Sequence, residues 1–391
     1  MIAGILRETY PGERRVATVP AVVQSLKKAG LDVLLEPGAG AAAGFPDEEY
    51  AAKGARLAVG RDQVLAEADV LLSVRSFGPH AGGPGPDCAR LRSGQAVVGM
   101  LDPLGSPENA RGLAERGVTA YALELIPRTT RAQSMDVLSS MATIAGYKAV
   151  LLAADALPRM FPMLMTAAGT VSPARVLVVG AGVAGLQAIA SARRLGAVVE
   201  AYDVRPAVKE QIESLGAKFV ELPLETAAAQ DAGGYAKAQS DDFLRRQREL
   251  MGRVVGASDV VITTAAVPGQ RAPLLVTREM LRGMHPGSVV VDLAAETGGN
   301  CEATRPGEEV VEHGVRVLGP LNVGASIPYH ASQLYARNLA NFLAHAVKNG
   351  WRETEPKDDI VRETRVTHAG QVAHPRLREK LGLPEATATP A

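Results

Sequence analysis

The sequence predicts an α/β protein with two parallel-sheet domains joined by long helices. The chain has 391 residues, whereas a single hydrophobic core stops growing at roughly 250 to 300 residues, so we expect two domains. Short apolar runs alternate with amphipathic stretches along most of the chain, which is the pattern of βα units. Apolar residues make up 47% of the chain and charged residues 21%, as in an ordinary globular protein.

The first βα series starts at the N-terminus. Residues Met1–Leu6 are apolar but lack a basic region and a cleavage site, so they predict a first strand and no secretion signal. Further strands are expected at 33–35, 70–74 and 96–101, and a helix at 46–53. Apolar residues at helical spacing then predict a long interdomain helix over 136–157.

A second βα series starts at Val176, with strands expected at 198–201, 218–220, 260–263, 289–293 and 315–318. A later helix, 334–347, has no further sheet to pack against, so we expect it to return to the first domain. We therefore predict a discontinuous N-terminal domain of residues 1–136 plus 320–391, and a second domain of residues 137–319. The last forty or so residues show no pattern that we can assign.

Charge and cysteine content exclude several classes of function. Forty-two basic residues balance forty-two acidic ones, so no net field attracts nucleic acid or an anionic membrane. The two cysteines, Cys88 and Cys301, are too few for a disulfide framework and lack metal-ligand spacing, so we expect packing roles and no metal. The uncharged stretch 176–192 is broken by glycines and too short to span a bilayer. We expect no direct membrane insertion.

A glycine motif identifies the second domain as Rossmann-like. Gly180-Ala-Gly182-Val-Ala-Gly185 follows an apolar strand and opens a helix expected at 186–195, and Asp203 ends the next strand. In this motif the first glycine permits a tight turn, the second admits a pyrophosphate, and the third allows close packing of helix on strand. The motif therefore predicts a dinucleotide site with its phosphates at the helix N-terminus.

Asp203 favours NAD over NADP, because it can accept hydrogen bonds from ribose hydroxyls and would repel a 2′-phosphate. Arg205 complicates this argument, since an arginine near this position can accommodate that phosphate. Further along, residues 263–269 lie at the carboxyl end of an expected strand, which is where ligands of open α/β sheets bind. They could bind the nucleotide or form a plain turn.

Two other polar segments each allow two interpretations. The cluster Arg128-Thr-Thr-Arg-Ala-Gln-Ser-Met-Asp136, with Ser139 one turn later, is either a capped helix entry with Ser134 as N-cap or a site. As a site, it offers an amide and an arginine to hold a nicotinamide carboxamide and its ribose. The excursion 222–250 is longer than an ordinary βα connection and is either a mobile lid or a solvated helical hairpin.

Together these motifs resemble the NAD(H)-binding domain of proton-translocating NAD(P) transhydrogenase. The matching stretches are Glu13–Val16, Glu36–Gly40, Arg128–Tyr147, Phe161–Thr170, Gly180–Pro206, Gly233–Lys237 and Val291–Asn300. Of these, the run Arg131-Ala-Gln-Ser-Met-Asp136 is the most specific. The resemblance implies two domains with NAD in the cleft between them, and a discontinuous first domain.

The resemblance also implies roles for individual residues. Arg128, Gln133, Asp136 and Ser139 would contact the nicotinamide end and form the catalytic set, and Gln133 would also reach toward the partner's NADP(H). Asp203 would bind the adenosine ribose, Val183 the phosphates, and Tyr235 would lie on a mobile loop that closes over the nucleotide. The full set expected to bind NAD(H) is Arg128, Thr129, Thr130, Arg131, Gln133, Asp136, Ser139, Gly180, Gly182, Val183, Gly185, Asp203, Val204, Arg205, Gly234, Tyr235, Thr264 and Ala265.

The activity implied by the resemblance is hydride transfer from NADH bound here to NADP⁺ on a partner subunit, coupled to proton translocation by membrane subunits. The implied partners are a second copy of the chain, an NADP(H)-binding β-subunit domain and membrane-spanning subunits. The chain ends at Ala391 without membrane helices, so it resembles the three-subunit arrangement, with the soluble piece as its own polypeptide. We expect a cytoplasmic protein, peripheral on the cytoplasmic face of the inner (plasma) membrane.

The chief alternative is alanine dehydrogenase, a relative with the same fold. Its reaction interconverts an amine and a carbonyl, so it needs a proton carrier besides the hydride donor. The lysine and histidine expected of that enzyme meet Arg75 and Asp102 here, whereas Arg15 could bind a carboxylate in either protein. A non-catalytic NAD-binding regulator is a third alternative.

Overall fold

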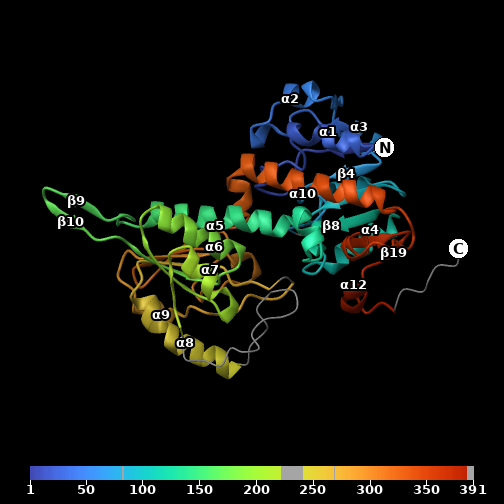
Figure 1. Ribbon diagram of the computed structural model, residues 1–391. Helices are drawn as coiled ribbons and strands as arrows, with labels where there is room; N and C mark the ends of the chain where they lie inside the picture. Colours follow the sequence, from blue (N-terminus) through green and yellow to red (C-terminus); the bar gives the residue numbers. More distant parts are fainter. Residues whose placement is uncertain (82, 222–240, 268, 385–391) are drawn as a thin grey trace. The chain divides into compact units, whose positions relative to one another are not determined.

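The structure is a computed structural model that describes residues 1–81, 83–221, 241–267 and 269–384. The chain divides into two compact units (Figure 1). Unit 1 consists of Met1–Met141 and Gly324–Ala391, and unit 2 consists of Ala142–Val323. Each unit is built on one predominantly parallel sheet, which confirms the predicted α/β class.

Unit 1 contains an eight-stranded sheet with the order β19-β18-β8-β7-β4-β1-β2-β3. The six strands from β8 to β3 are parallel, whereas β18 and β19 run antiparallel at one edge. The strands are β1 (Ile2–Ile5), β2 (Asp32–Leu35), β3 (Arg56–Leu57), β4 (Val70–Leu72), β7 (Ala96–Gly99), β8 (Thr119–Ala122), β18 (Arg365–His368) and β19 (Gln371–Val372), and a separate hairpin pairs β5 (Pro79–His80) with β6 (Gly83–Pro84).

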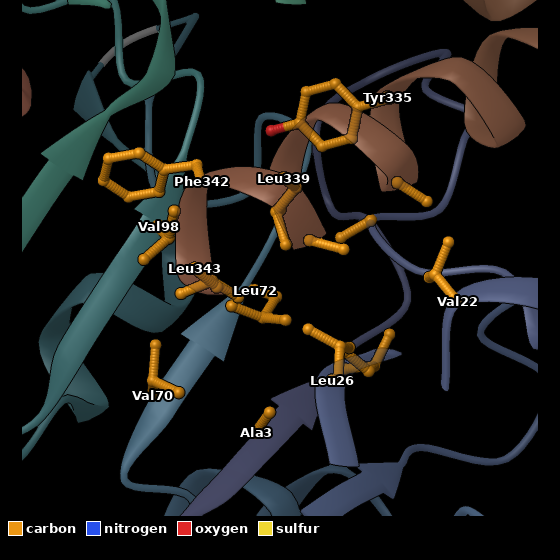
Figure 2. Close-up of a cluster of buried hydrophobic side chains, with 14 of the residues drawn as sticks. Ala3, Val22, Leu26, Val70, Leu72, Val98, Tyr335, Leu339, Phe342 and Leu343 are labelled. Atoms are coloured by element: carbon orange, nitrogen blue, oxygen red, sulfur yellow. The ribbon is translucent and has the colours of Figure 1, made fainter. Parts of the chain in front are cut away.

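Helices cover both faces of this sheet, because alternate strand residues point to opposite sides. Val70 and Leu72 of β4 pack with α1 and α10, whereas Leu71 packs with α3, α4 and α12. Figure 2 shows Leu26 of α1 and Leu339 of α10 beside the strand residues of the first face. The helices are α1 (Pro20–Lys28), α2 (Asp47–Ala52), α3 (Arg61–Glu67), α4 (Pro107–Glu115), α10 (Pro328–Lys348), α11 (Asp359–Thr364) and α12 (Pro375–Lys380).

The C-terminal segment, which showed no assignable sequence pattern, completes the sheet of unit 1. β18 pairs antiparallel with β8. The hydroxyl of Thr367 donates to the backbone oxygen of Val118 at 2.7 Å and accepts from the backbone nitrogen of Ala120 at 3.1 Å. The side chain of Thr367 therefore takes part in strand pairing, and a polar residue occupies a fully buried position of β18.

Unit 2 contains a seven-stranded sheet with the order β13-β12-β11-β14-β15-β17-β16, parallel except for β16. The strands are β11 (Arg175–Val179), β12 (Val198–Tyr202), β13 (Lys218–Phe219), β14 (Val260–Thr263), β15 (Val289–Asp292), β16 (Glu309–Glu312) and β17 (Val315–Leu318). The strand order reverses between β11 and β14, and ligands of open α/β sheets bind beyond the carboxyl ends of the strands at such a point.

Both faces of this second sheet are also covered. Val178 of β11 packs with α5, α6 and α7, whereas Leu177 packs with α8 and α9. The helices are α5 (Val137–Ala156), α6 (Val183–Arg194), α7 (Lys209–Ser214), α8 (Asp241–Gly256) and α9 (Arg278–Arg282). The hairpin of β9 (Leu164–Thr166) and β10 (Gly169–Val171) projects from this unit and is exposed along both strands (Figure 1).

The long predicted helix is α5. By length and composition it is the one helix of the described chain that could cross a membrane, with 20 residues and a mean hydropathy of 1.5 in its most apolar window. Core helices of folded proteins meet the same test. Val137 is fully buried in the core of unit 1, and Ala149 and Val150 in that of unit 2, so this helix is weak support for a membrane span.

Candidate functional site

The glycine motif of unit 2 forms a tight turn after β11. Gly180 has φ +97°, a conformation that side chains disfavour. A Cβ added at Gly185 would lie 1.8 Å from the backbone oxygen of Gly180, and one at Gly180 would lie 2.7 Å from the hydroxyl oxygen of Thr264. The first and third glycines of the motif are therefore required by packing.

Gly182 has a different role, because a Cβ built there would meet nothing within 4 Å. Gly182 is the N-cap of α6 and Val183 is 38% exposed. The helix begins at Val183 and not at Leu186 as predicted, since Leu186 already donates its N–H to the oxygen of Gly182 at 2.9 Å. Open space therefore lies beside the N-terminus of α6, and the backbone N–H groups of a first helical turn can bind anionic phosphates.

Asp203 lies directly after β12 and is 7% exposed. Its carboxylate accepts a hydrogen bond from the backbone nitrogen of Ala181 at 2.7 Å, which ties it to the glycine turn. It also accepts hydrogen bonds from the backbone nitrogen of Arg205 at 2.8 Å and from Nε and Nη2 of the same residue, both at 2.9 Å. The guanidinium of Arg205 is therefore charge-paired with Asp203.

Thr264 and Ala265 follow β14 and join the same turn. The N–H of Thr264 donates to the oxygen of Val179 at 2.9 Å, which extends the pairing with β11, and its hydroxyl donates to the oxygen of Gly180 at 2.9 Å. The side-chain amide of Asn300 bridges the next residue, accepting from the nitrogen of Ala265 at 3.0 Å and donating to its oxygen at 2.8 Å. This loop is held in one conformation at the switch point of the sheet.

Asp292 is the residue on which this arrangement depends, and no role was predicted for it. It is fully buried at the end of β15. Its carboxylate accepts five hydrogen bonds, from the hydroxyls of Thr263 and Thr304 and from the backbone nitrogens of Ala294, Asn300 and Cys301, at 2.7 to 3.0 Å. The sequence signal was an acidic residue ending an apolar strand before two glycines.

The second group of predicted site residues lies in unit 1, around the 3₁₀ turn Thr130–Met135. Ala132 and Met135 are buried at 0% and 6% exposure, so Gln133 between them is held at the surface. Arg128, Thr129, Thr130 and Arg131 are also exposed, whereas Asp136 and Ser139 are half-buried. The guanidinium of Arg131 pairs with the carboxylates of Asp358 and Asp359.

Asp136, and not Ser134, caps the helix that follows. Its carboxylate accepts hydrogen bonds from the backbone nitrogen of Ser139 at 2.9 Å and from the hydroxyl of Ser139 at 2.6 Å. This is the geometry of an N-cap residue with the third residue of its helix. The alternative in which Ser134 is the N-cap is therefore wrong, because the 3₁₀ turn continues to Met135 and α5 begins at Val137. The predicted residues Gly234 and Tyr235 lie outside the described residues.

Among the residues that the structure describes, no group of three or more histidine, cysteine or acidic side chains could hold a metal ion. Cys88 and Cys301 are both buried, and burial raises the pKa of each thiol to about 11. Both thiols therefore stay protonated at neutral pH, which agrees with packing roles.

Comparison with known proteins places this arrangement in a family. The profile of the N-terminal domain described as alanine dehydrogenase/PNT matches residues 4–145, and that of the corresponding C-terminal domain matches residues 149–375. The chain belongs to the alanine dehydrogenase/PNT family.

Named members of this family align with almost the whole chain. The first part of the NAD(P) transhydrogenase subunit alpha of Rhodospirillum rubrum is 47% identical over 381 residues, which is 96% of this chain and 99% of that protein. The alanine dehydrogenase of Mycobacterium tuberculosis is 31% identical over 391 residues, covering 98% of each. The crystal structure of the transhydrogenase of Sinorhizobium meliloti superposes with a TM-score of 0.83 at 46% identity, covering 96% of this chain and 100% of that one.

The positions that should distinguish the two branches of the alanine dehydrogenase/PNT family lie in unit 1. Arg75 donates its backbone N–H to Glu8 at 2.8 Å, and its guanidinium carbon lies 3.8 Å from the ring centroid of Tyr10. Asp102 has φ +46° and donates its N–H to Glu124. Arg15 is buried and binds the carboxylate of Glu13 through Nε at 2.7 Å and Nη2 at 2.6 Å.

Glu8 and Glu124 are half-buried residues whose carboxyl groups bind the loops that carry Arg75 and Asp102. Burial raises the pKa of each to about 7, although hydrogen bonds from backbone N–H groups oppose the shift. Glu124 Oε1 accepts from the nitrogens of Leu101 and Asp102, whereas its Oε2 has no hydrogen-bond partner among the described residues.

We expect the stability of unit 1 to fall as the pH rises from about 5 to 8. The pKa of Glu124 is about 7 in the folded chain, against 4.5 for an ordinary glutamate. Between these values the folded state binds more protons than the unfolded state, so the free energy of unfolding decreases with pH. Glu124→Gln keeps the acceptor at Oε1 and removes the titration, and it should stabilise unit 1 at pH 8 by about 2 kcal/mol.

Urea unfolding followed through the fluorescence of Trp351 measures this effect, because Trp351 is the single tryptophan of the chain and lies 3% exposed in unit 1. Glu8→Gln should act with the same sign. If the free energy of unfolding of the wild type does not fall over this pH range, the raised pKa values of Glu8 and Glu124 are contradicted. They are also contradicted if the free energy of unfolding of Glu124→Gln depends on pH as steeply as that of the wild type.

Proposed function

We propose that this chain is the NAD(H)-binding α subunit of a proton-translocating NAD(P)⁺ transhydrogenase. In this proposal hydride passes directly between NADH held by this chain and NADP⁺ held by a partner subunit. The observation that carries the proposal is the glycine turn at the switch point of unit 2, with open space at Gly182 and Asp203 tied to the turn. These residues fit a dinucleotide, since the first turn of α6 can bind its pyrophosphate and Asp203 its adenosine ribose.

The pairing of Asp203 with Arg205 supports NAD over NADP. A 2′-phosphate beside Asp203 would be repelled by its carboxylate. The guanidinium of Arg205 could offset this repulsion, but it is already paired with that carboxylate, and the side chains of Arg205 and Asp203 are only 14% and 5% exposed. Removing one partner of such a pair from the other is costly. Val204 lies between these two residues in the sequence and offers backbone groups at the same sheet edge.

We propose that Arg128, Gln133, Asp136 and Ser139 orient the nicotinamide end, with Thr129, Thr130 and Arg131 in the same segment. When bound, NAD(H) supplies the hydride at its nicotinamide ring. Gln133 is exposed and can donate and accept hydrogen bonds with a carboxamide. Asp136 holds the hydroxyl of Ser139 at 2.6 Å and so fixes its direction. Because hydride moves between carbon atoms without a proton, positioning replaces a general acid or base.

The proposed partners follow from the same function. The family relative of 47% identity is named as one portion of an α subunit, which supports the existence of further subunits. We propose an NADP(H)-binding β-subunit domain, membrane-spanning subunits and a second copy of this chain as partners. The chain would act on the cytoplasmic face of the inner (plasma) membrane, attached through those subunits.

Reconstitution tests the proposal. The purified chain is mixed with the NADP(H)-binding subunit, and reduction of an NADP⁺ analogue by NADH is followed by absorbance. We expect rapid transfer, slowed about 10- to 100-fold in Gln133→Asn, because a shorter side chain misplaces the amide by about one methylene length, with little change in NADH binding.

Two outcomes would support the alternatives instead. Turnover of L-alanine with NAD⁺ by the isolated chain would indicate an alanine dehydrogenase. The 31% identity to such an enzyme is the observation behind this alternative. NADH binding without turnover under either condition would indicate a regulator.

A further inference from the structure

The turn that carries Gln133 is bound to a distant part of unit 1. The carbonyl oxygen of Ser134 accepts a hydrogen bond from Nδ2 of Asn338 at 2.8 Å and another from Nδ2 of Asn341 at 3.1 Å. Both asparagines lie on α10, three residues apart, and therefore on one face of that helix. A carbonyl has two lone pairs, so these two amides satisfy it completely.

Asn338 is a buried residue whose amide donates to the carbonyl oxygen of Ser134. It is only 7% exposed, and its Oδ1 has no hydrogen-bond partner among the described residues. A buried polar group without a partner is unfavourable, so Oδ1 of Asn338 carries a cost. Within the described chain, the bond from Nδ2 to Ser134 is the interaction that compensates this cost.

A second contact holds the turn on the N-terminal side of Gln133, through the side chain of Arg131. Arg131 pairs with Asp358 at 3.2 Å and also with Asp359. Asp358 is itself fixed, because it accepts from Nε2 of His345 at 2.9 Å and from the backbone nitrogen of Val361 at 3.1 Å as the N-cap of α11. His345 lies on α10, two turns after Asn338.

We propose that Asn338, Asn341 and Asp358 are positioning residues for Gln133, an inference that rests on the proposed hydride-transfer function. They hold the backbone on both sides of Gln133, so that its exposed amide keeps one direction while NADH binding depends mainly on the glycine turn of unit 2. Arg131, expected to bind NAD(H), serves in this proposal to attach the turn to α11. A misplacement of about 1 Å in such a segment can slow a reaction about 100-fold.

The test uses the full chain with the NADP(H)-binding subunit. Asn338→Leu is nearly isosteric and removes the buried donor, and Asn341→Ala removes the second. We expect the double variant to lower the single-turnover rate constant at saturating NADH about 10- to 100-fold, with the Kd for NADH changed by less than about threefold. Asn338→Leu alone, which retains the amide of Asn341, should lose less of the rate than the double variant.

A matched control and a second measurement complete the test. Gln24→Ala removes another side-chain amide bonded to a backbone oxygen of unit 1, that of Lys53 at 2.6 Å, and should leave the rate unchanged. A wild-type rate in the double variant, or a loss in rate matched by an equal loss in NADH affinity, would overturn the inference.

If the wild-type chain itself transfers no hydride, the proposed function fails, and amide hydrogen exchange then decides whether the attachment exists. Exchange at residues 133–136 that rises in the double variant and not in Gln24→Ala supports the attachment. Unchanged exchange in these residues would overturn it whatever the result of the transfer assay.

Discussion

Gly185→Ala is expected to unfold or severely destabilise unit 2 and to abolish NADH binding. An alanine Cβ at this position would lie 1.8 Å from the oxygen of Gly180 and 2.8 Å from its carbonyl carbon. Both are backbone atoms at the end of a buried strand, so neither can move without displacing β11 from α6. Overpacking of a core costs about 1–3 kcal/mol and occasionally more, and we expect at least about 3 kcal/mol here because the obstacle is backbone.

Gly182→Ala is the matched variant in the same turn. Its Cβ would meet nothing within 4 Å, and its φ of −76° is allowed for alanine. We expect wild-type stability but NADH binding weakened at least about 10-fold, because the methyl group would occupy the approach of the pyrophosphate.

Circular dichroism melting curves and NADH fluorescence titrations separate these effects. Trp351 fluorescence should report normal folding of unit 1 in both variants, since the chain has no tryptophan in unit 2. Gly112→Ala, in α4 with nothing within 4 Å, controls for the substitution itself. Normal NADH binding by Gly182→Ala would show that the pyrophosphate does not lie over this residue.

Asp292→Asn is expected to cost about 2–4 kcal/mol of stability in unit 2, because each buried donor left without an acceptor costs about 1–3 kcal/mol. The carboxylate accepts from two hydroxyls and three backbone N–H groups. The hydroxyls of Thr263 and Thr304 can rotate, but whichever oxygen becomes an amide nitrogen then faces at least one backbone N–H.

The same substitution should weaken NADH binding about 10-fold or more, by loosening the loop that ends at Asn300 and with it the contact to Ala265. Thermal unfolding and NADH titration measure the two effects. Asp69→Asn is the control, because Asp69 makes one comparable bond, to the nitrogen of Ile2 at 2.7 Å, in unit 1. A variant as stable as the wild type would mean that Asp292 is not the centre of this network.

Much of the fold could be predicted from apolar periodicity, and the reason is visible in the strands. Those of both sheets are buried on two faces, so they form continuous apolar runs such as Val260–Thr263. The edge strand β16 and the strand β18, which lies beside the edge strand β19, were not predicted. Glu309–Glu312 alternates exposed and half-buried residues, and Arg365–His368 pairs partly through the hydroxyl of Thr367.

The candidate site was predictable where a local motif carries it. Packing requires glycine at Gly180 and Gly185, whereas open space lies beside Gly182, and the spacing of the motif alone indicates these roles. No role was predicted for Asp292, because an acidic residue at the end of an apolar strand does not by itself show which donors its carboxylate binds. The attachments of the Gln133 turn were not predictable, because they join residues far apart in the sequence. Arg131 meets Asp358 across more than two hundred residues, and no local pattern indicates that their charges are paired.

The most direct test of the account is to follow the reacting hydrogen itself. NADH labelled with deuterium at the transferred C4 position is supplied to the chain together with the NADP(H)-binding subunit and NADP⁺, and the product NADPH is analysed by mass spectrometry. The account predicts that the deuterium appears in NADPH without exchange with water, because no proton carrier takes part. NADPH that has lost the label to solvent, or NADH oxidation without formation of NADPH, would contradict direct transfer between two nicotinamides.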